Sequence, residues 1–259
     1  MLDDIVFSGG LGSQILSYMT LEVRKSKGDS PRVNVDYFYQ SQIGTPHDSK
    51  LTYWGWELDR YGIALPPYQP LWNDRITRRL LQRHGYVHPK NASALGQLKQ
   101  FDFRSLFPIS DRSPLLGSRL GLPTMSGYCA IHIRRGDYLT ASSRIITVDE
   151  IVALVQKLPI QKFECVIIFS DTPLDVREEE ILRQVLKQDI KICVGEDQHA
   201  VHGMLRSADL LITSNSTFSV TAGLLMEKDK AVVISPQHFF PSLRNVNSIF
   251  QNFGEWMIY

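Results

Sequence analysis

Short apolar runs alternate with amphipathic runs along the second half of the chain. The apolar, β-prone runs predict strands at 128–133, 163–170, 190–194, 209–213 and 231–235. Between them, apolar residues recur at helical spacing in runs at 148–157, 175–188, 200–207 and 217–227. Strands that alternate with helices in this way predict an α/β fold with a parallel, doubly wound sheet.

The first half of the chain starts with the same alternation. A strand at 4–8, a glycine turn, a helix at 15–27 and a strand at 32–37 predict a βαβ unit. The aromatic-rich stretch 38–69 is typical either of exposed rings that bind carbohydrate or of rings that pack a loop-rich region. The run 73–84 predicts a helix with an arginine-rich face, which is either simply solvated or attracted to an anionic membrane surface or a pyrophosphate-linked acceptor.

The sequence P-T-M-S-G at 123–127 predicts a domain boundary, because proline and glycine interrupt regular structure there. We therefore expect an N-terminal, acceptor-side α/β domain at 1–125 and a C-terminal Rossmann-like domain at 126–241. The tail, 242–259, is expected to form a closing helix that packs back on the first domain.

The composition limits the classes of partner that the protein is expected to bind. The chain has 259 residues, 43% of them hydrophobic, 21% charged, and a net charge of +1, so nothing in its charge calls for nucleic acid. It contains no run of about 18 apolar residues, and its first residues lack the basic start of a signal peptide. These features predict a cytoplasmic protein with three free thiols, at Cys129, Cys165 and Cys193.

Polar and charged residues follow four of the predicted strands at the point where each ends. In an open α/β sheet, ligands bind beyond the carboxyl ends of the strands. These four ends carry arginine, carboxylate and hydroxyl groups: His132, Arg134, Arg135 and Asp137; Ser170 and Asp171; Gly195, Glu196 and Asp197; and Ser214, Asn215, Ser216, Thr217, Phe218 and Ser219. The pattern predicts an anion site, and a sugar-nucleotide diphosphate is the anion we expect.

The chemistry of these groups suggests a task for each. Arg134 offers a planar fork of donors that suits a phosphate. The run 214–219 opens a helix, whose N–H groups, hydroxyls and positive dipole end suit the same phosphate. Asp171 could accept two N–H groups from the edge of a guanine base. Arg135 is expected to brace the turn through Asp137 or a neighbouring carboxylate.

No metal is expected on the diphosphate, because the chain contains no Asp-x-Asp pair and arginine can supply the positive charge instead. His199 and His202 are three residues apart on a predicted helix and could share a metal ion, but no third ligand is evident. A catalytic cysteine is the sharper alternative for the thiols, although their apolar surroundings favour inert, buried side chains.

The glycine loop at 9–14, G-G-L-G-S-Q, is ambiguous when taken alone. It lacks the Gly-Lys-Ser/Thr of a P-loop, and its spacing is not that of a dinucleotide-binding turn. One interpretation is a tight strand-to-helix turn. The other is close approach of the Gly10 and Gly12 backbone to a ligand.

Three ordered stretches resemble the inverting α1,2-fucosyltransferases, a family that uses GDP-fucose. G-G-L-G-S-Q is similar to that family's G-G-L-G-N-Q, and H-I-R-R-G-D-Y at 132–138 matches its signature. F-S-D at 169–171 and S-N-S-T-F-S at 214–219 match two further blocks. Two departures are Ser13, where the family has asparagine, and Val220-Thr221, where an aromatic pair is common.

The resemblance implies a GT-B-like fold, with two facing Rossmann-like domains and a donor cleft between them. It also implies that Arg134 holds the β-phosphate of GDP-β-L-fucose and that His132 and Asp171 approach the guanine. Ser214, Asn215, Ser216 and Thr217 would then line the phosphates. The implied reaction is galactoside α1,2-fucosylation with inversion, without a metal, on an oligosaccharide or lipid-linked surface-polysaccharide precursor at the inner face of the membrane.

The general base is left open by the residues. Asp36, Asp137 and the pair His47-Asp48 are candidates by position only, and holding the arginine turn suits Asp137 better. Two other functions also stay open: a transferase for another nucleotide sugar or acceptor, and a non-catalytic nucleotide-binding module.

Overall fold

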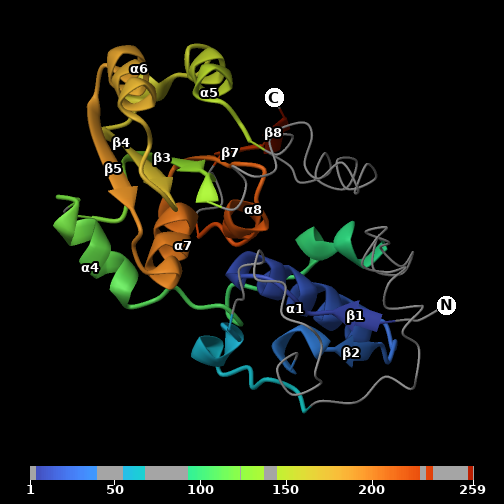
Figure 1. The fold of residues 1–259 in the computed structure, drawn as a ribbon. Helices are drawn as coiled ribbons and strands as arrows, with labels where there is room; N and C mark the ends of the chain where they lie inside the picture. The colour runs from blue at the N-terminus through green and yellow to red at the C-terminus, as the bar shows by residue number, and fades with distance from the viewer. Residues whose placement is uncertain are drawn as a thin grey trace. The chain divides into compact units, whose positions relative to one another are not determined.

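The computed structural model describes residues 4–39, 55–67, 93–122, 124–136, 145–227, 232–235 and 256–258. The described residues up to Phe107 form one compact unit, and those from Pro108 onward form a second (Figure 1). All strand pairs in both units are parallel, and helices connect them, which confirms the α/β class. A donor cleft between two facing domains stays a prediction.

The first unit begins with the predicted βαβ arrangement. Its elements are β1 (Asp4–Val6), α1 (Leu11–Ser26) and β2 (Arg32–Asn34), with Ile5 opposite Val33 in the two-stranded sheet. The apolar face of α1 is buried, and the helix starts four residues earlier than the pattern predicts. In the described part of this unit, three short 3-10 helices follow: η1 (Asp36–Tyr39), η2 (Leu58–Tyr61) and η3 (Leu98–Gln100).

The described aromatic residues of this unit pack against one another. The Trp56 ring lies 5.5 Å from that of Phe7 and 5.2 Å from that of Phe38, measured between centroids. Tyr18 and Tyr61 both meet Phe107 edge-on, as aromatic pairs prefer. These contacts favour the packing interpretation for the rings that the structure describes. The predicted basic helix at 73–84 lies outside the described residues.

The second unit is built on a six-stranded parallel sheet in the order β5-β4-β3-β6-β7-β8. All five strands predicted for this half are present. Their bounds are β3 (Tyr128–Ile133), β4 (Cys165–Ser170), β5 (Asp189–Val194), β6 (Leu210–Ile212) and β7 (Val232–Ser235), and β8 (Trp256–Ile258) adds a sixth strand.

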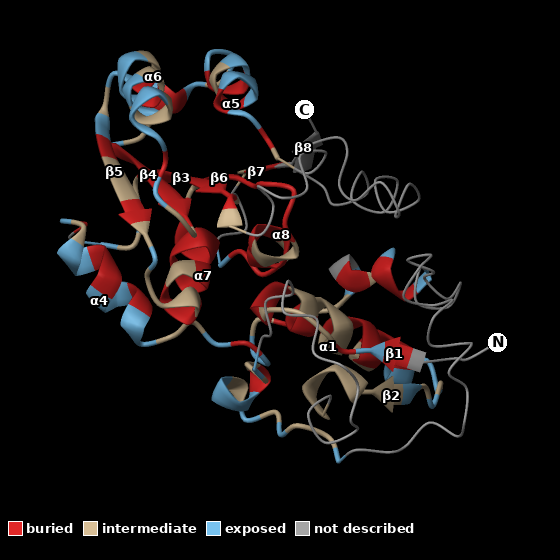
Figure 2. Cartoon of the chain, viewed as in Figure 1, coloured by how far each residue is buried: buried red, intermediate tan, exposed pale blue. Residues whose placement is uncertain are grey.

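Helices cover both faces of this sheet. One face carries α5 (Val148–Val155) and α6 (Val176–Leu186), preceded by the 3-10 helix η6 (Ile160–Lys162); the other carries α4 (Arg112–Arg119), α7 (Gln198–Ser207) and α8 (Thr217–Leu224). Every residue of β3 and β4 is therefore buried (Figure 2). A strand buried on both faces reads as a continuous apolar run, which explains why these two strands were evident in the sequence.

The predicted domain boundary at 125/126 is wrong, because α4 belongs with the second unit. The Ser113 hydroxyl of α4 donates to the Ala200 carbonyl of α7 at 3.0 Å. Gly203 permits this approach, since a Cβ built there would overlap Ser113 Oγ. Leu116 of α4 and Met204 of α7 join the same apolar cluster. The division therefore falls between Phe107 and Pro108.

The prediction for the tail is also wrong where the structure describes it. Residues 256–258 form a strand, not a helix, and β8 pairs with β7 of the second unit, with Met257 opposite Ile234. The apolar run W-M-I is too short to distinguish a strand from a helix, and pairing with the edge of β7 decides it. The rest of 242–259 lies outside the described residues.

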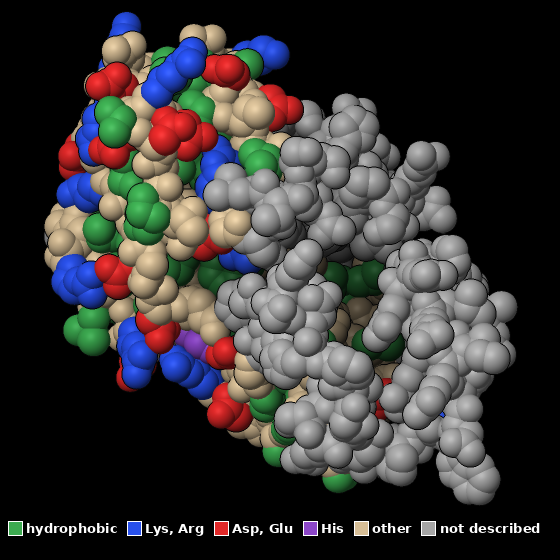
Figure 3. All heavy atoms as spheres, viewed as in Figure 1, with side chains coloured by type: hydrophobic (Ala, Val, Ile, Leu, Met, Phe, Trp, Pro, Cys, Tyr) green, Lys and Arg blue, Asp and Glu red, His purple; other side chains and the backbone are tan. Residues whose placement is uncertain are grey.

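The surface agrees with the near-neutral composition. On the face seen in Figure 3, Lys and Arg side chains are interspersed with Asp and Glu over the described part of the second unit.

Within the described ranges, no helix combines the length and apolar character that crossing a bilayer requires.

Candidate functional site

The strand order of the second unit identifies one preferred edge for a ligand. From β3 the chain moves outward through β4 to β5, and then crosses back to β6 on the other side of β3. Connections after β3 and β6 therefore diverge, and the crevice between them is where doubly wound sheets bind nucleotides. The signature residues follow β3, and the serine-rich run follows β6. The four predicted strand ends are adjacent, as expected.

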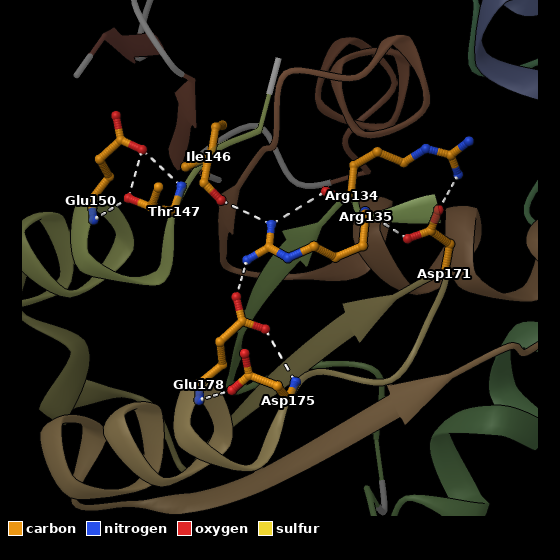
Figure 4. Close-up of polar contacts among 8 residues, drawn as sticks. All are labelled: Arg134, Arg135, Ile146, Thr147, Glu150, Asp171, Asp175 and Glu178. Atoms are coloured by element: carbon orange, nitrogen blue, oxygen red, sulfur yellow. Dashed lines mark hydrogen bonds and ion pairs between the residues drawn. The ribbon is translucent and has the colours of Figure 1, made fainter. Parts of the chain in front are cut away.

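Arg134 and Asp171 meet at the ends of β3 and β4. Arg134 Nη1 lies 2.8 Å from Asp171 Oδ2, and the two side chains are 18% and 22% exposed. The second carboxylate oxygen, Oδ1, accepts the backbone N–H of Arg135 at 2.8 Å. Figure 4 shows the carboxylate lying between the guanidinium and the backbone of the turn. Asp171 thus holds both the Arg134 side chain and the Arg135 backbone in the turn that follows β3. We call this turn, residues 134–136, the β3 exit.

The Arg135 side chain points away from that of Arg134 and is buried (Figure 4). Its Nη1 donates to the Ile146 carbonyl at 2.9 Å, and its Nη2 lies 2.7 Å from Glu178 Oε1. The prediction that Arg135 braces the turn through a carboxylate is confirmed, and Glu178 is that carboxylate.

Glu178 performs a second task at the start of α6. Its other oxygen, Oε2, accepts the Asp175 backbone N–H at 3.2 Å, while Asp175 Oδ1 accepts the Glu178 N–H at 2.7 Å. This reciprocal pair is a capping box. Thr147 and Glu150 form a second one at the start of α5, directly after Ile146. Arg135 therefore ties the β3 exit to the start of both helices on that face.

His132 links the end of β3 to the end of β6, on the other side of the switch point. Its Nδ1 lies 2.7 Å from the Ser214 hydroxyl, so a direct side-chain hydrogen bond links the ends of β3 and β6. Ser214 Oγ in turn lies 3.4 Å from Ser219 Oγ, and Ser219 Oγ also accepts the Ser214 N–H at 3.2 Å. The predicted donor-binding residues His132 and Ser214 are thus brought together, at the expected place.

The remaining residues of the serine-rich run are largely committed to the fold. Asn215 and Ser216 are buried, and the Ser216 hydroxyl caps α8 by accepting the Phe218 N–H at 3.3 Å. Thr217, the first residue of α8, is partly exposed. Capping supports the prediction that this run opens a helix. The phosphate contacts assigned to these residues stay predictions.

Phe218 has a packing role that the sequence did not assign to it. Its ring lies between two histidines, 5.3 Å from the His132 ring and 5.4 Å from the His202 ring, measured between centroids. Thr221 Oγ1 donates its one proton to a carbonyl, that of Thr217 at 2.9 Å or Phe218 at 3.1 Å, and so accepts from His202 Nε2 at 3.2 Å. The departure from the family pattern at Thr221 therefore gives His202 a hydrogen-bond acceptor.

The acidic residues after β5 face α4. Asp197 caps α7 by accepting the His199 and Ala200 N–H groups, both at 3.0 Å, and it also pairs with Arg112 at 2.8 Å. Glu196 pairs with Arg119 of α4. This strand end is therefore engaged in holding α4 and starting α7.

The glycine loop belongs to the first unit, and its contacts are those of a tight turn. Gly9, with φ of +71°, is the residue that needs to be glycine, while Gly10 caps α1 in an extended conformation and Gly12 is buried in the first turn of α1. Gln14 closes the turn: its amide donates to the carbonyls of Gly9 and Gly55, both at 2.8 Å, and accepts the Glu57 N–H at 2.9 Å. Contact of Gly10 and Gly12 with a ligand stays a prediction.

The candidate bases receive less support from the structure. Asp36 lies in η1, just after β2, where its backbone N–H bonds to Asn34 Oδ1 at 3.0 Å. Asp137 and the pair His47-Asp48 lie outside the described residues.

Comparison with known proteins gives a limited result. No family model matches the chain, and no curated protein matches its sequence. Among solved structures, it is similar to POFUT1 in complex with GDP, at 13% identity and a TM-score of 0.48, over 90% of this chain and 97% of that one. It is also similar to POFUT1 in complex with GDP-fucose (13%, 0.47, 90% and 97%) and to NodZ alpha-1,6-fucosyltransferase soaked with GDP-fucose (14%, 0.40, 86% and 91%).

Two other kinds of chemistry find little support at this site. Burial raises the pKa of the Cys129, Cys165 and Cys193 thiols, so none is poised as a thiolate nucleophile at neutral pH. Among the described residues, no three His, Cys, Asp or Glu side chains converge as metal ligands, and His202 Nε2 lies 3.2 Å from Thr221 Oγ1.

The two histidines around Phe218 make stability depend on pH. Burial, and then the nearby Arg134 charge, lowers the pKa of His132 to about 3, and burial with Arg206, His199 and His132 lowers the pKa of His202 well below its usual range. The unfolded chain takes up protons below about pH 6.5 that the folded chain cannot bind. The free energy of unfolding is therefore expected to fall as the pH falls from 6.5, by up to about 1.4 kcal/mol per pH unit for each histidine.

This dependence can be measured by urea unfolding between about pH 7.5 and 5, where most carboxylates stay ionised. His202→Gln keeps an N–H near the Thr221 hydroxyl but cannot titrate, so we expect a smaller loss of stability over this range. An equal slope in the variant and the unmodified protein would contradict the assignment.

Proposed function

We propose that this protein is an inverting glycosyltransferase that moves L-fucose from GDP-β-L-fucose to a hydroxyl of a terminal galactoside, forming an α1,2 linkage. The observation that carries this proposal is the position of the H-I-R-R-G motif. It places Arg134 and His132 at the switch point of a doubly wound sheet, with Ser214 bonded to His132 across it. That edge is where such sheets bind nucleotides, and the motif resembles that of GDP-fucose enzymes.

The diphosphate would lie between Arg134 and the start of α8. A guanidinium offers paired donors to phosphate oxygens, and the positive end of the α8 dipole adds a smaller attraction for the same charge. Burial and the Arg134 charge keep His132 neutral, because they lower its pKa to about 3. A neutral imidazole bonded to Ser214 can present its other nitrogen to the nucleotide without adding charge.

The reaction is a single in-line displacement. The acceptor oxygen forms a bond to C1 of fucose as the bond from C1 to the diphosphate oxygen breaks, so the β-linked donor gives an α-linked product. The negative charge that develops on GDP is taken up by Arg134, without a metal ion. The acceptor hydroxyl loses its proton to a base, for which Asp36, Asp137 and the pair His47-Asp48 are the candidates.

The proposed acceptor is an oligosaccharide or lipid-linked glycan ending in galactose. The setting would be surface-polysaccharide synthesis of the O-antigen type in the cytoplasm, with peripheral contact at the inner face of the membrane. These details rest on the resemblance of the motifs.

Nucleotide-dependent stabilisation tests the donor. We expect GDP, at concentrations above its dissociation constant, to raise the melting temperature, whereas UDP and ADP do not. The result should be the same in EDTA. A donor-by-acceptor screen with linkage analysis then tests the reaction. Stabilisation by UDP instead of GDP would rule out fucosyl transfer, and GDP binding without transfer to any galactoside would indicate a non-catalytic module.

A further inference from the structure

We propose that Asp171 is a positioning residue that fixes the Arg134 guanidinium for the diphosphate, and not a residue that reads the guanine base. The identity of the nucleotide rests on the proposed function, but the role of Asp171 toward a diphosphate does not. The resemblance of the F-S-D block implies contact with guanine, so the two roles predict different results.

The first argument is the use of both carboxylate oxygens. To read guanine, one carboxylate edge must face the N1–H and the 2-amino group together. In the structure, Oδ2 contacts Arg134 Nη1 and Oδ1 accepts the Arg135 N–H, both at 2.8 Å. Each of the two carboxylate oxygens therefore already has a donor of the protein as its partner.

The second argument is the surroundings of the pair. With only about a fifth of each side chain exposed, the Arg134–Asp171 pair is less screened by water than a surface ion pair. The backbone bond from Arg135 adds a second restraint, and Arg135 is itself held by Glu178 and Ile146. Asp171 thus connects the phosphate-binding side chain to a buried anchor.

The third argument is the glycine of the signature. Gly136 has φ of +23°, and a Cβ built there would overlap Asp171 Oδ2 and lie 3.3 Å from its Cγ. The absence of a side chain at 136 lets the carboxylate reach beneath the turn. Asp171 therefore contacts all three residues of the R-R-G sequence. A residue whose role is to bind the guanine base would not need these contacts.

The test must separate positioning from charge. Asp171→Asn would remove the carboxylate's repulsion of the ligand while it disturbs the arginine, and the two effects on affinity oppose each other. Asp171→Glu keeps the charge and moves it by one methylene, and Gly136→Ala keeps Asp171 but displaces it. Asp189→Glu, at an exposed carboxylate that pairs with Lys191, and Gly28→Ala, at φ of +79° with open space around it, are the matched controls.

Binding of inorganic pyrophosphate, GDP and inosine diphosphate is measured by calorimetry for each variant. We expect Asp171→Glu and Gly136→Ala each to weaken all three ligands by the same factor, roughly tenfold, as for a lost charge-assisted bond. The ratio of GDP to inosine diphosphate affinity should not change, since inosine lacks only the 2-amino group. In an Arg134→Ala background the same substitutions should cause no further loss, which a general structural role would not predict.

The opposite pattern would overturn the proposal: weaker GDP binding with unchanged pyrophosphate binding and an altered ratio to inosine diphosphate. It would also be overturned if the unmodified protein did not bind pyrophosphate, or if Arg134→Ala did not weaken that binding. Pyrophosphate binding with no preference for GDP over UDP would instead refute the proposed donor, and the pyrophosphate measurements would still decide the role of Asp171.

Discussion

If the protein catalyses the proposed fucosyl transfer, replacing Arg134 by alanine is expected to lower its kcat by about a thousandfold, close to 4 kcal/mol of transition-state stabilisation. The Arg134 side chain is 18% exposed and so more accessible than that of Arg135, which is buried among its own partners. Without the Arg134 guanidinium, the charge that develops on the departing GDP loses its paired donors. The measurement is the initial rate of GDP release from GDP-fucose in the presence of a galactoside acceptor.

The fold should tolerate this change better than the loss of Arg135, because about a fifth of Asp171 is exposed and water can solvate its carboxylate when the arginine is gone. Arg183→Ala removes an exposed arginine that pairs with Glu179 on α6, so its activity is expected to stay close to that of the unmodified enzyme. Arg134→Lys keeps a point charge without the planar fork and should recover only part of the rate. If Arg134→Ala kept more than about a tenth of the turnover, Arg134 would not be the phosphate anchor proposed here.

The sheet of the second unit could be predicted because burial on both faces leaves a strong signal. The continuous apolar run of β3 and the clear helical spacing of α6 each report local structure. The capping boxes at Thr147 and Asp175 are equally local, since three residues separate their partners. Strand ends, and therefore the neighbourhood of the site, follow from this local information.

Domain membership could not be predicted in the same way. The prolines near residues 108 and 123 both interrupt regular structure, and the sequence offers no local reason to prefer one as a boundary. A long-range contact determines the boundary: Ser113 of α4 packs against α7 where Gly203 has no side chain. Likewise, β8 is three residues long and becomes a strand by pairing with β7.

The site shows the same division between local and long-range information. The sequence allowed us to predict that Arg135 pairs with a carboxylate, because burying an unpaired charge is costly. Which carboxylate it would be depends on how α6 packs over the sheet, and Glu178 is 43 residues away. The bond between His202 and Thr221 could not be predicted, because a histidine on a helix and a threonine in an apolar run carry no shared pattern.

Replacing Arg135 by alanine is expected to destabilise the protein, in contrast to Arg134→Ala. Arg135 is 5% exposed and bonds to Glu178, which is 25% exposed, and to the Ile146 carbonyl. Its removal leaves a partly buried carboxylate and a buried carbonyl without their donor, at a cost of about 3 kcal/mol. For a chain of this size the melting temperature should fall by about 10 °C, measured by calorimetry or circular dichroism.

The coupling between Arg135 and Glu178 can be isolated by a double-mutant cycle. Glu178→Gln is the matched partner, because glutamine also serves in a capping box and so preserves the start of α6. Each single variant should lose most of the pair's contribution, and the double variant should then be more stable than the sum of the two losses predicts, by about 1–2 kcal/mol. Arg183→Ala, which breaks an exposed pair on the same helix, should cost under about 1 kcal/mol. Equal losses for Arg135→Ala and Arg183→Ala would mean that the buried arginine does not anchor the turn, and the fixed position of Arg134 would then need another cause.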